Sequence, residues 1–103
     1  MLLIREIMYC KPGKVKPMVE KFLAMSKFAN GSAPGKFRVL TDFSGERYWT
    51  IVAEMETPDL KSFEEMMQGR SMTPEHKKEM EALMKGYHDL IDHGRREIYK
   101  IEG

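Results

Sequence analysis

Apolar and polar positions alternate with a period that changes along the chain, and each period predicts one element. Residues 2–10 are mostly aliphatic and predict a strand, which ends at Pro12 because proline cannot continue a β-ladder. Apolar residues at helical spacing then predict a helix to about Ala29. Strict alternation over residues 36–43, followed by β-branched and aromatic residues over 47–55, predicts a β-hairpin.

Two threonine–proline pairs predict the starts of two further helices. In 57–59 and in 73–75 the threonine suits the N-cap, the proline suits the first helical position, and an acid follows near the positive end of the helix dipole. We expect the first of these helices to end at Gly69. The apolar positions of the second helix continue to Ile91, so we expect it to reach His93 and to stop at Gly94. Residues 96–101 then predict the last strand.

The order of these elements is β, α, β, β, α in two pieces, β, within one domain over residues 1–103. This is the ferredoxin-like α+β arrangement, a four-stranded antiparallel sheet with helices on one face. The strands, however, are apolar on both faces, with Ile4 and Met8 opposed to Ile7 and Tyr9 in the first strand. No predicted element remains to cover the second face, so we expect a second copy of the chain to cover it in a homodimer.

Composition and charge exclude several classes of partner. The chain of 103 residues has a formal net charge of +1, which gives no electrostatic reason to expect binding to nucleic acid or to an anionic membrane. No apolar stretch is long enough to span a bilayer, and the start of the chain is not typical of a signal peptide. The single cysteine, Cys10, cannot form an internal disulfide, so we expect a reducing, cytoplasmic location.

The chain as a whole resembles the dimeric α/β-barrel superfamily, in which two ferredoxin-like subunits pack sheet to sheet. The segments that carry the resemblance are Lys11-Pro12-Gly13-Lys14, Val52-Ala53-Glu54-Met55-Glu56 and Leu60-Lys61-Ser62-Phe63. The closing Arg96-Glu97-Ile98-Tyr99-Lys100-Ile101 is similar to the last strand of NIPSNAP-like members. The resemblance implies a homodimer with a pocket between each sheet and its helices.

The superfamily includes cofactor-free monooxygenases of antibiotic biosynthesis and haem-degrading enzymes, so the resemblance implies a fold more directly than a reaction. Haem-degrading members use an asparagine on the first strand and a tryptophan near the end of the third. This chain has no asparagine in its first strand, and Trp49 stands near the start of its predicted third strand. Monooxygenases often carry a histidine on the helix after the hairpin, where this chain has Glu64-Glu65-Met66-Met67.

Candidate chemistry comes from histidines and from polar residues on apolar strands. We take His76 and His88 as candidate acid–base residues, because histidine titrates near neutral pH; a purely structural role near the helix ends is the alternative. The candidate binding residues are Arg5, Tyr9, Arg38, Trp49, Glu54 and Tyr87. An arginine among them could orient a carboxylate or phenolate, and ion pairs between subunits are the alternative. No pair of histidines has zinc-ligand spacing, and we expect no metal and no cofactor.

Two hypotheses for the function follow. The first is a small hydrophobic or aromatic ligand bound between sheet and helices, with cofactor-independent monooxygenase-like activity. The second is a non-enzymatic homodimeric binding or interaction module with a filled core.

Overall fold

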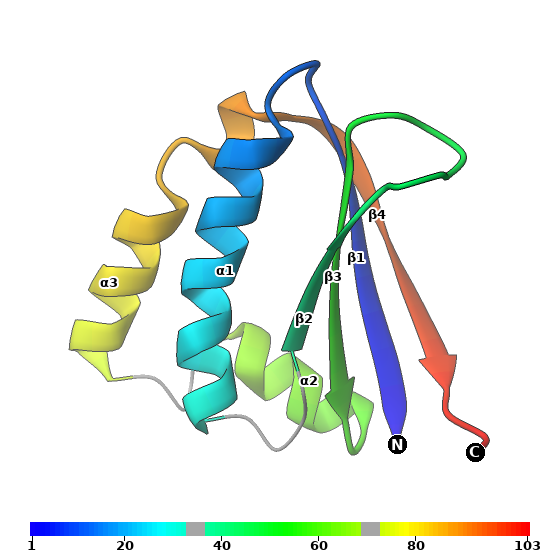
Figure 1. The fold of residues 1–103 in the computed structure, drawn as a ribbon. Helices are drawn as coiled ribbons and strands as arrows, with labels where there is room; N and C mark the ends of the chain where they lie inside the picture. Colours follow the sequence, from blue (N-terminus) through cyan, green and yellow to red (C-terminus); the bar gives the residue numbers. More distant parts are fainter. Residues whose placement is uncertain (33–36, 69–72) are drawn as a thin grey trace.

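The computed structural model describes residues 1–32, 37–68 and 73–103 of the chain. The elements in chain order are β1 (Leu2–Cys10), α1 (Val15–Ser32), β2 (Phe37–Thr41), β3 (Thr50–Thr57), α2 (Leu60–Met67), α3 (Pro74–Met84), the short 3-10 helix η1 (Tyr87–Asp89) and β4 (Ile91–Lys100) (Figure 1). No helix within these ranges is long and apolar enough to cross a membrane. Residues 30–35 are turn formers that predict a loop, but α1 includes residues 30–32. Residues 33–35 of that loop, Lys36 and the predicted helix end at Gly69 lie outside the described residues.

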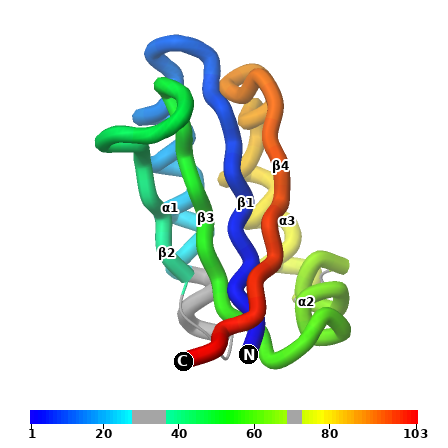
Figure 2. The backbone as a smooth tube through the Cα atoms, turned by 90° about the vertical axis from the view of Figure 1, so that its right-hand side faces the viewer, coloured from blue at the N-terminus to red at the C-terminus, as the bar shows by residue number. Residues whose placement is uncertain are grey.

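The four strands form one antiparallel sheet in the order β2-β3-β1-β4. The helices lie on one face of this sheet, and the other face has no helix over it (Figures 1 and 2). The Cα extents of 37 × 34 × 19 Å fit a body of two layers, one of strands and one of helices. The predicted α+β, ferredoxin-like fold is therefore confirmed.

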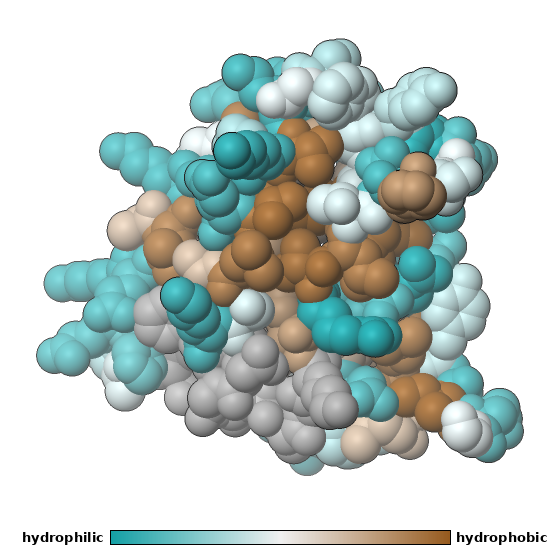
Figure 3. Space-filling view, in the orientation of Figure 1, coloured by the Kyte–Doolittle hydropathy of each residue, from teal (hydrophilic) through white to brown (hydrophobic). Residues whose placement is uncertain are grey.

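The core lies between α1 and the sheet, where apolar residues of both layers meet. Met18 of α1 and Ile51 of β3 have 0% of their surface exposed, and Phe22 and Ala53 pack with them. Ile4 of β1 is equally buried. Burial of one such large side chain contributes roughly 1.5–3 kcal/mol, so these contacts are a main source of stability. Figure 3 shows a cluster of hydrophobic residues at the centre of that view, with hydrophilic residues around it.

Side-chain caps fix the starts of two helices and the end of one. Thr73 is the N-cap of α3, as predicted, with its hydroxyl accepting from the His76 N–H at 3.2 Å. The predicted N-cap Thr57 is wrong: it is the last residue of β3, and Asp59 caps α2 by accepting from the Ser62 N–H at 2.7 Å. At the end of α3, Lys21 of α1 donates to two backbone carbonyls, Leu83 at 3.1 Å and Lys85 at 2.7 Å. Leu83 belongs to the last turn of α3 and Lys85 is its C-cap, where backbone carbonyls lack N–H donors from within the helix.

The predicted long helix ending at His93 is wrong. α3 ends at Met84, Gly86 has a left-handed φ of 84°, and the chain enters β4 at Ile91 after a single 3-10 turn. His93 and Gly94 are therefore strand residues, and β4 begins five residues earlier than predicted. The apolar spacing of Tyr87 and Ile91 suits a helix equally well, which is why the periodicity did not reveal the break.

The predicted hairpin forms between β2 and β3, but the short turn expected at Ser44-Gly45 is a longer loop. β3 begins at Thr50, and residues 42–49 form a loop that we name the hairpin loop. The Asp42 carboxylate accepts from the Thr50 N–H at 2.9 Å, which closes the loop at the point where pairing begins. Trp49 has a φ of 61°, a left-handed value that strand residues do not adopt. Aromatic residues such as Tyr48 and Trp49 favour strands statistically, so composition predicts the start of β3 at residue 47 instead of at Thr50.

Candidate functional site

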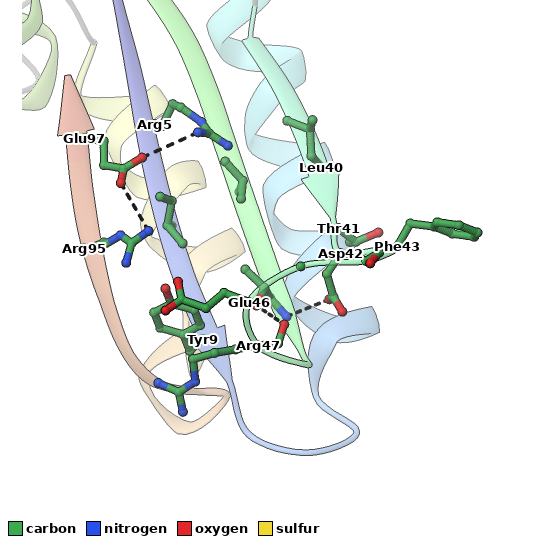
Figure 4. Close-up of a pocket in the computed structure, with 15 residues that line it drawn as sticks. Arg5, Tyr9, Leu40, Thr41, Asp42, Phe43, Glu46, Arg47, Arg95 and Glu97 are labelled. Atoms are coloured by element: carbon green, nitrogen blue, oxygen red, sulfur yellow. Dashed lines mark hydrogen bonds and ion pairs between the residues drawn. The ribbon is translucent and has the colours of Figure 1, made fainter. Parts of the chain in front are cut away.

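The face without helices carries a hollow of about 410 Å³ beneath the hairpin loop (Figure 4). We name this the open face; in β1 it carries Arg5, Ile7 and Tyr9. Ile7, Val52 and Leu40 form an apolar floor, and the hairpin loop forms one wall. Although no helix covers them, Ile7 is 5% exposed and Tyr9 7% exposed. The hollow therefore has an apolar floor with charged groups around it.

A row of alternating charges crosses the open face from β2 to β4, and we name it the charge ladder. Its nitrogen–oxygen distances are Arg38 Nη2 to Glu54 Oε1 2.6 Å, Glu54 Oε2 to Arg5 Nε 3.0 Å, Arg5 Nη1 to Glu97 Oε1 3.6 Å, and Glu97 Oε2 to Arg95 Nη2 3.2 Å. Strand register places Arg38, Glu54, Arg5 and Glu97 opposite one another across all four strands. The ladder lies along one side of the hollow, which Arg5, Arg95 and Glu97 line.

Glu54 is the most enclosed member of the charge ladder, with 9% of its side chain exposed. An enclosed carboxylate needs compensation, which the two guanidinium groups beside it provide. The contact of Glu54 with Arg38 is a hydrogen bond. The contact with Arg5 is an ion pair whose N–H does not have hydrogen-bond geometry, so Arg5 Nε, itself out of contact with solvent, makes no hydrogen bond within the described residues.

At the loop end of the hollow, Tyr9, Arg47 and His93 contact one another. The Arg47 guanidinium carbon lies 4.6 Å from the centre of the Tyr9 ring, and Arg47 Nη1 lies 2.8 Å from His93 Nε2. The centroids of the Tyr9 and His93 rings are 4.8 Å apart. Arg47 and Tyr9 line the hollow directly, and His93 stands behind them on β4.

The helix side of the sheet carries a further ion pair and a buried cysteine. Glu6 and Arg96 form an ion pair between β1 and β4, and the Arg96 guanidinium lies 5.0 Å over the ring of Phe63 of α2. The Cys10 thiol is buried, and that burial, together with the nearby Asp42 charge, raises its pKa above 9.0. A thiol that stays protonated at neutral pH is a poor nucleophile.

The structure brings together four of the eight candidate residues. Arg5 and Tyr9 line the hollow, and Arg38 and Glu54 belong to the adjoining charge ladder. Trp49, 43% exposed, ends the hairpin loop without lining the hollow; its carbonyl accepts from the Cys10 N–H at 2.8 Å.

The other three candidates lie outside the hollow. Tyr87 and His88 belong to η1 with ring centroids 3.9 Å apart, and His76 is an exposed residue in the first turn of α3. The hollow thus lies on the face opposite to the one that the resemblance implies.

Sequence reasoning missed Arg47, Asp92, His93 and Arg95. Asp92, His93 and Arg95 belong to β4, whereas the sequence predicts a helix as far as His93 and a strand only from residue 96. The alternation of His93, Arg95, Glu97 and Tyr99 would have identified His93 and Arg95 as residues of one strand face. Within the described ranges, no group of three or more histidine, cysteine, aspartate or glutamate residues is arranged to hold a metal ion.

Comparisons with known proteins bear on the fold. No family model matches the sequence, and no curated protein matches it significantly. Among solved structures, an uncharacterized NIPSNAP-like domain protein from Burkholderia xenovorans has a TM-score of 0.75 at 13% identity, covering 97% of this chain and 84% of its own. A NIPSNAP family protein from Agrobacterium tumefaciens has a TM-score of 0.72 at 14% identity, covering 96% of this chain and 90% of its own.

An antibiotic biosynthesis monooxygenase is similar over the full length of both chains, with a TM-score of 0.71 at 11% identity. Identities this low establish the fold and leave the activity open. The chain therefore has the fold shared by NIPSNAP-like domain proteins and antibiotic biosynthesis monooxygenases.

Proposed function

We propose that this protein binds a small aromatic or hydrophobic molecule in the hollow on the open face, and that it does so as a homodimer closed over that face. The observation that carries the proposal is the hollow itself, which combines an apolar floor with arginines around it. Its volume of about 410 Å³ is in the range of small-ligand sites. An apolar floor favours a flat hydrophobic ligand, and an arginine favours one that also carries a carboxylate or phenolate.

The charge ladder supports closure by a second copy. A second sheet that packs on an unpaired charge would bury it at high cost, but each arginine and glutamate of the ladder already has a partner of opposite charge within the chain. Between the charges lie apolar groups, including Leu40 with 38% of its surface exposed. A partner sheet that covered these groups would also enclose the hollow.

A ligand screen by thermal unfolding tests the binding site. We expect small aromatic carboxylates and phenols to raise the melting temperature of the wild type. Val52→Trp fills the floor of the hollow and is expected to abolish the shift. Leu60→Trp, at an exposed position of α2 outside the hollow, serves as the matched control and keeps it. An equal shift in the wild type and in Val52→Trp would place the ligand elsewhere.

A second candidate function, cofactor-independent oxygenation, draws support from the likeness to an antibiotic biosynthesis monooxygenase. Within this chain, the observation that favours oxygenation is the close contact of the Tyr87 and His88 rings on the helix side of the molecule. In this hypothesis His88, with His76, acts as the base. Oxygen consumption with a dihydroxyaromatic substrate, lost in His88→Ala and His76→Ala, is the expected result. Consumption that both variants retain would reject the assignment.

A further inference from the structure

A β-bulge in β4 brings an aspartate beside a histidine at the loop end of the hollow. Tyr9 pairs with His93, whereas the next residue, Cys10, pairs with Ile91, so Asp92 is the extra residue of the bulge. Bulges re-aim side chains and are frequent beside functional sites. Here the Asp92 carboxylate oxygen Oδ2 lies 3.0 Å from His93 Nδ1, although neighbouring residues of a regular strand point to opposite faces.

The contacts of His93 determine which of its nitrogens carries the proton. Arginine has donors and no acceptor, so in the 2.8 Å contact Arg47 Nη1 donates and His93 Nε2 accepts. The ring is then neutral, and its remaining proton is on Nδ1, from which it is donated to Asp92 Oδ2. The bulge thus holds the imidazole in the tautomer that presents a basic nitrogen toward Arg47.

Arg47 is the cation best placed to receive an anion. Within the described part of the chain, none of the carboxylates lies within 4.0 Å of its guanidinium nitrogens, whereas the arginines of the charge ladder all have such partners. Its contacts are with the face of the Tyr9 ring and with the His93 nitrogen. Because Arg47 belongs to the exposed hairpin loop and also lines the hollow, it can turn from His93 to a ligand.

We propose that Tyr9, Arg47, Asp92 and His93 form an acid–base site that binds a small phenol or enol in the hollow and removes the proton of its acidic hydroxyl. This inference rests on the ligand site proposed above and names the class of ligand. The aromatic ring of the ligand packs against Tyr9, and its hydroxyl takes the place of the Arg47 contact at His93 Nε2.

The proposed step is a single proton transfer. The ligand O–H bond breaks, its proton joins His93 Nε2, and the electron pair stays on the ligand oxygen. The Asp92 carboxylate stabilises the imidazolium through Nδ1–H, and the Arg47 guanidinium pairs with the new oxyanion. Asp92 does not contact the ligand and is a positioning residue. The other charged groups on this part of the face, Arg95 and Glu97, are already paired with each other.

para-Nitrophenol is a direct probe of this step, since its phenolate is coloured and its neutral form is not. The full chain is titrated with the probe at a pH at which most of the free probe is neutral. We expect the wild type to bind it and to increase the ratio of phenolate to phenol about tenfold, the equivalent of one pKa unit. His93→Gln keeps an acceptor but cannot take up a proton, so it is expected to bind the probe without that increase.

Two further variants separate the roles within the site. Arg47→Gln removes the partner of the oxyanion and is expected to lower both affinity and phenolate fraction. Lys100→Gln removes the same charge at the far end of β4 and is expected to change neither. Asp92→Asn is expected to retain binding with a reduced phenolate fraction. All variants change exposed side chains, and thermal unfolding checks that each is folded.

The outcomes distinguish this inference from the proposed function. An equal phenolate fraction in the wild type and in His93→Gln would overturn the acid–base site. Binding of benzoate that Val52→Trp abolishes, without ionisation of para-nitrophenol, would also overturn it while leaving the ligand site in place. Failure of the wild type to bind either probe would reject both.

Discussion

Glu54 is almost fully enclosed on a face that has no helix over it, and it contacts Arg38 and Arg5 on either side. We expect Glu54→Ala to lower the free energy of unfolding by about 1–2 kcal/mol, because it leaves two neighbouring guanidinium groups without their shared counter-charge. Both arginines are partly exposed, which keeps the loss below that of a fully buried pair. Urea unfolding measures it.

Glu102→Ala is the matched control for Glu54→Ala. Glu102 also has an ionic partner, Lys100 at 3.8 Å, but its side chain is 80% exposed. Exposed pairs contribute little, so the change in unfolding free energy is expected to stay within about 0.5 kcal/mol. Equal losses in the two variants would contradict the structural role that we assign to the charge ladder.

Cys10 provides a pH-dependent prediction at the residue scale. Burial, and secondarily the Asp42 charge, raise the pKa of its thiol above the ordinary value of 9.0. A raised acid pKa means that the folded state favours the neutral thiol, so this group weakens stability only as pH rises above the unfolded pKa. At neutral pH we expect alkylation of the native protein to be much slower than alkylation in urea. Equal rates in the two states would contradict the burial of Cys10.

Elements that have a long, regular pattern of apolar residues and a marked first residue could be predicted from the sequence. The strand predicted over 2–10 agrees with β1, and the helix predicted after it agrees with α1, although α1 extends to Ser32 rather than ending near Ala29. The boundaries that failed depend on interactions that one-dimensional patterns do not contain. β3 starts late because Asp42 closes the hairpin loop, and β4 starts early because Gly86 adopts a left-handed conformation.

Gly94 tests the early start of β4 directly. A Cβ at this position would lie 2.8 Å from the Ile7 carbonyl oxygen of β1, closer than a carbon atom can approach without movement of the strands. We therefore expect Gly94→Ala to destabilise the protein by about 1–3 kcal/mol and to accelerate amide exchange in β4. In Gly45→Ala the new atom meets only Asp42 Cβ at 3.8 Å, so that variant is the control. An unaffected Gly94→Ala would argue for the helical end predicted from the sequence.

The candidate site shows, at the scale of the whole molecule, the same dependence on interactions that the sequence pattern does not contain. Arg5, Tyr9, Arg38 and Glu54 could be found from sequence, because polar residues are unusual on strands that are otherwise apolar. Their partners could not, since strand register decides that Arg5 lies opposite both Glu54 and Glu97. Arg47 and His93 meet only because the hairpin loop folds over the start of β4, a contact between residues 46 positions apart. The side of the sheet that carries the hollow is likewise a property of the folded chain.

The arrangement of the whole molecule leads to a prediction about its assembly. The structure has two layers, and the apolar floor between the charges of the open face has no covering layer of its own. We expect the wild type to sediment as a dimer at micromolar concentration. Leu40→Glu puts an unpaired carboxylate at the centre of the proposed contact, where desolvation costs about 3 kcal/mol, so the dissociation constant rises by a factor of about 100. Leu23→Glu makes the same change on α1, where the leucine is 48% exposed against 38% for Leu40, and is expected to leave the dimer intact. A wild type that sediments as a monomer throughout this range would remove the homodimer while leaving the hollow and its acid–base cluster, which belong to a single chain, open to the ligand tests above.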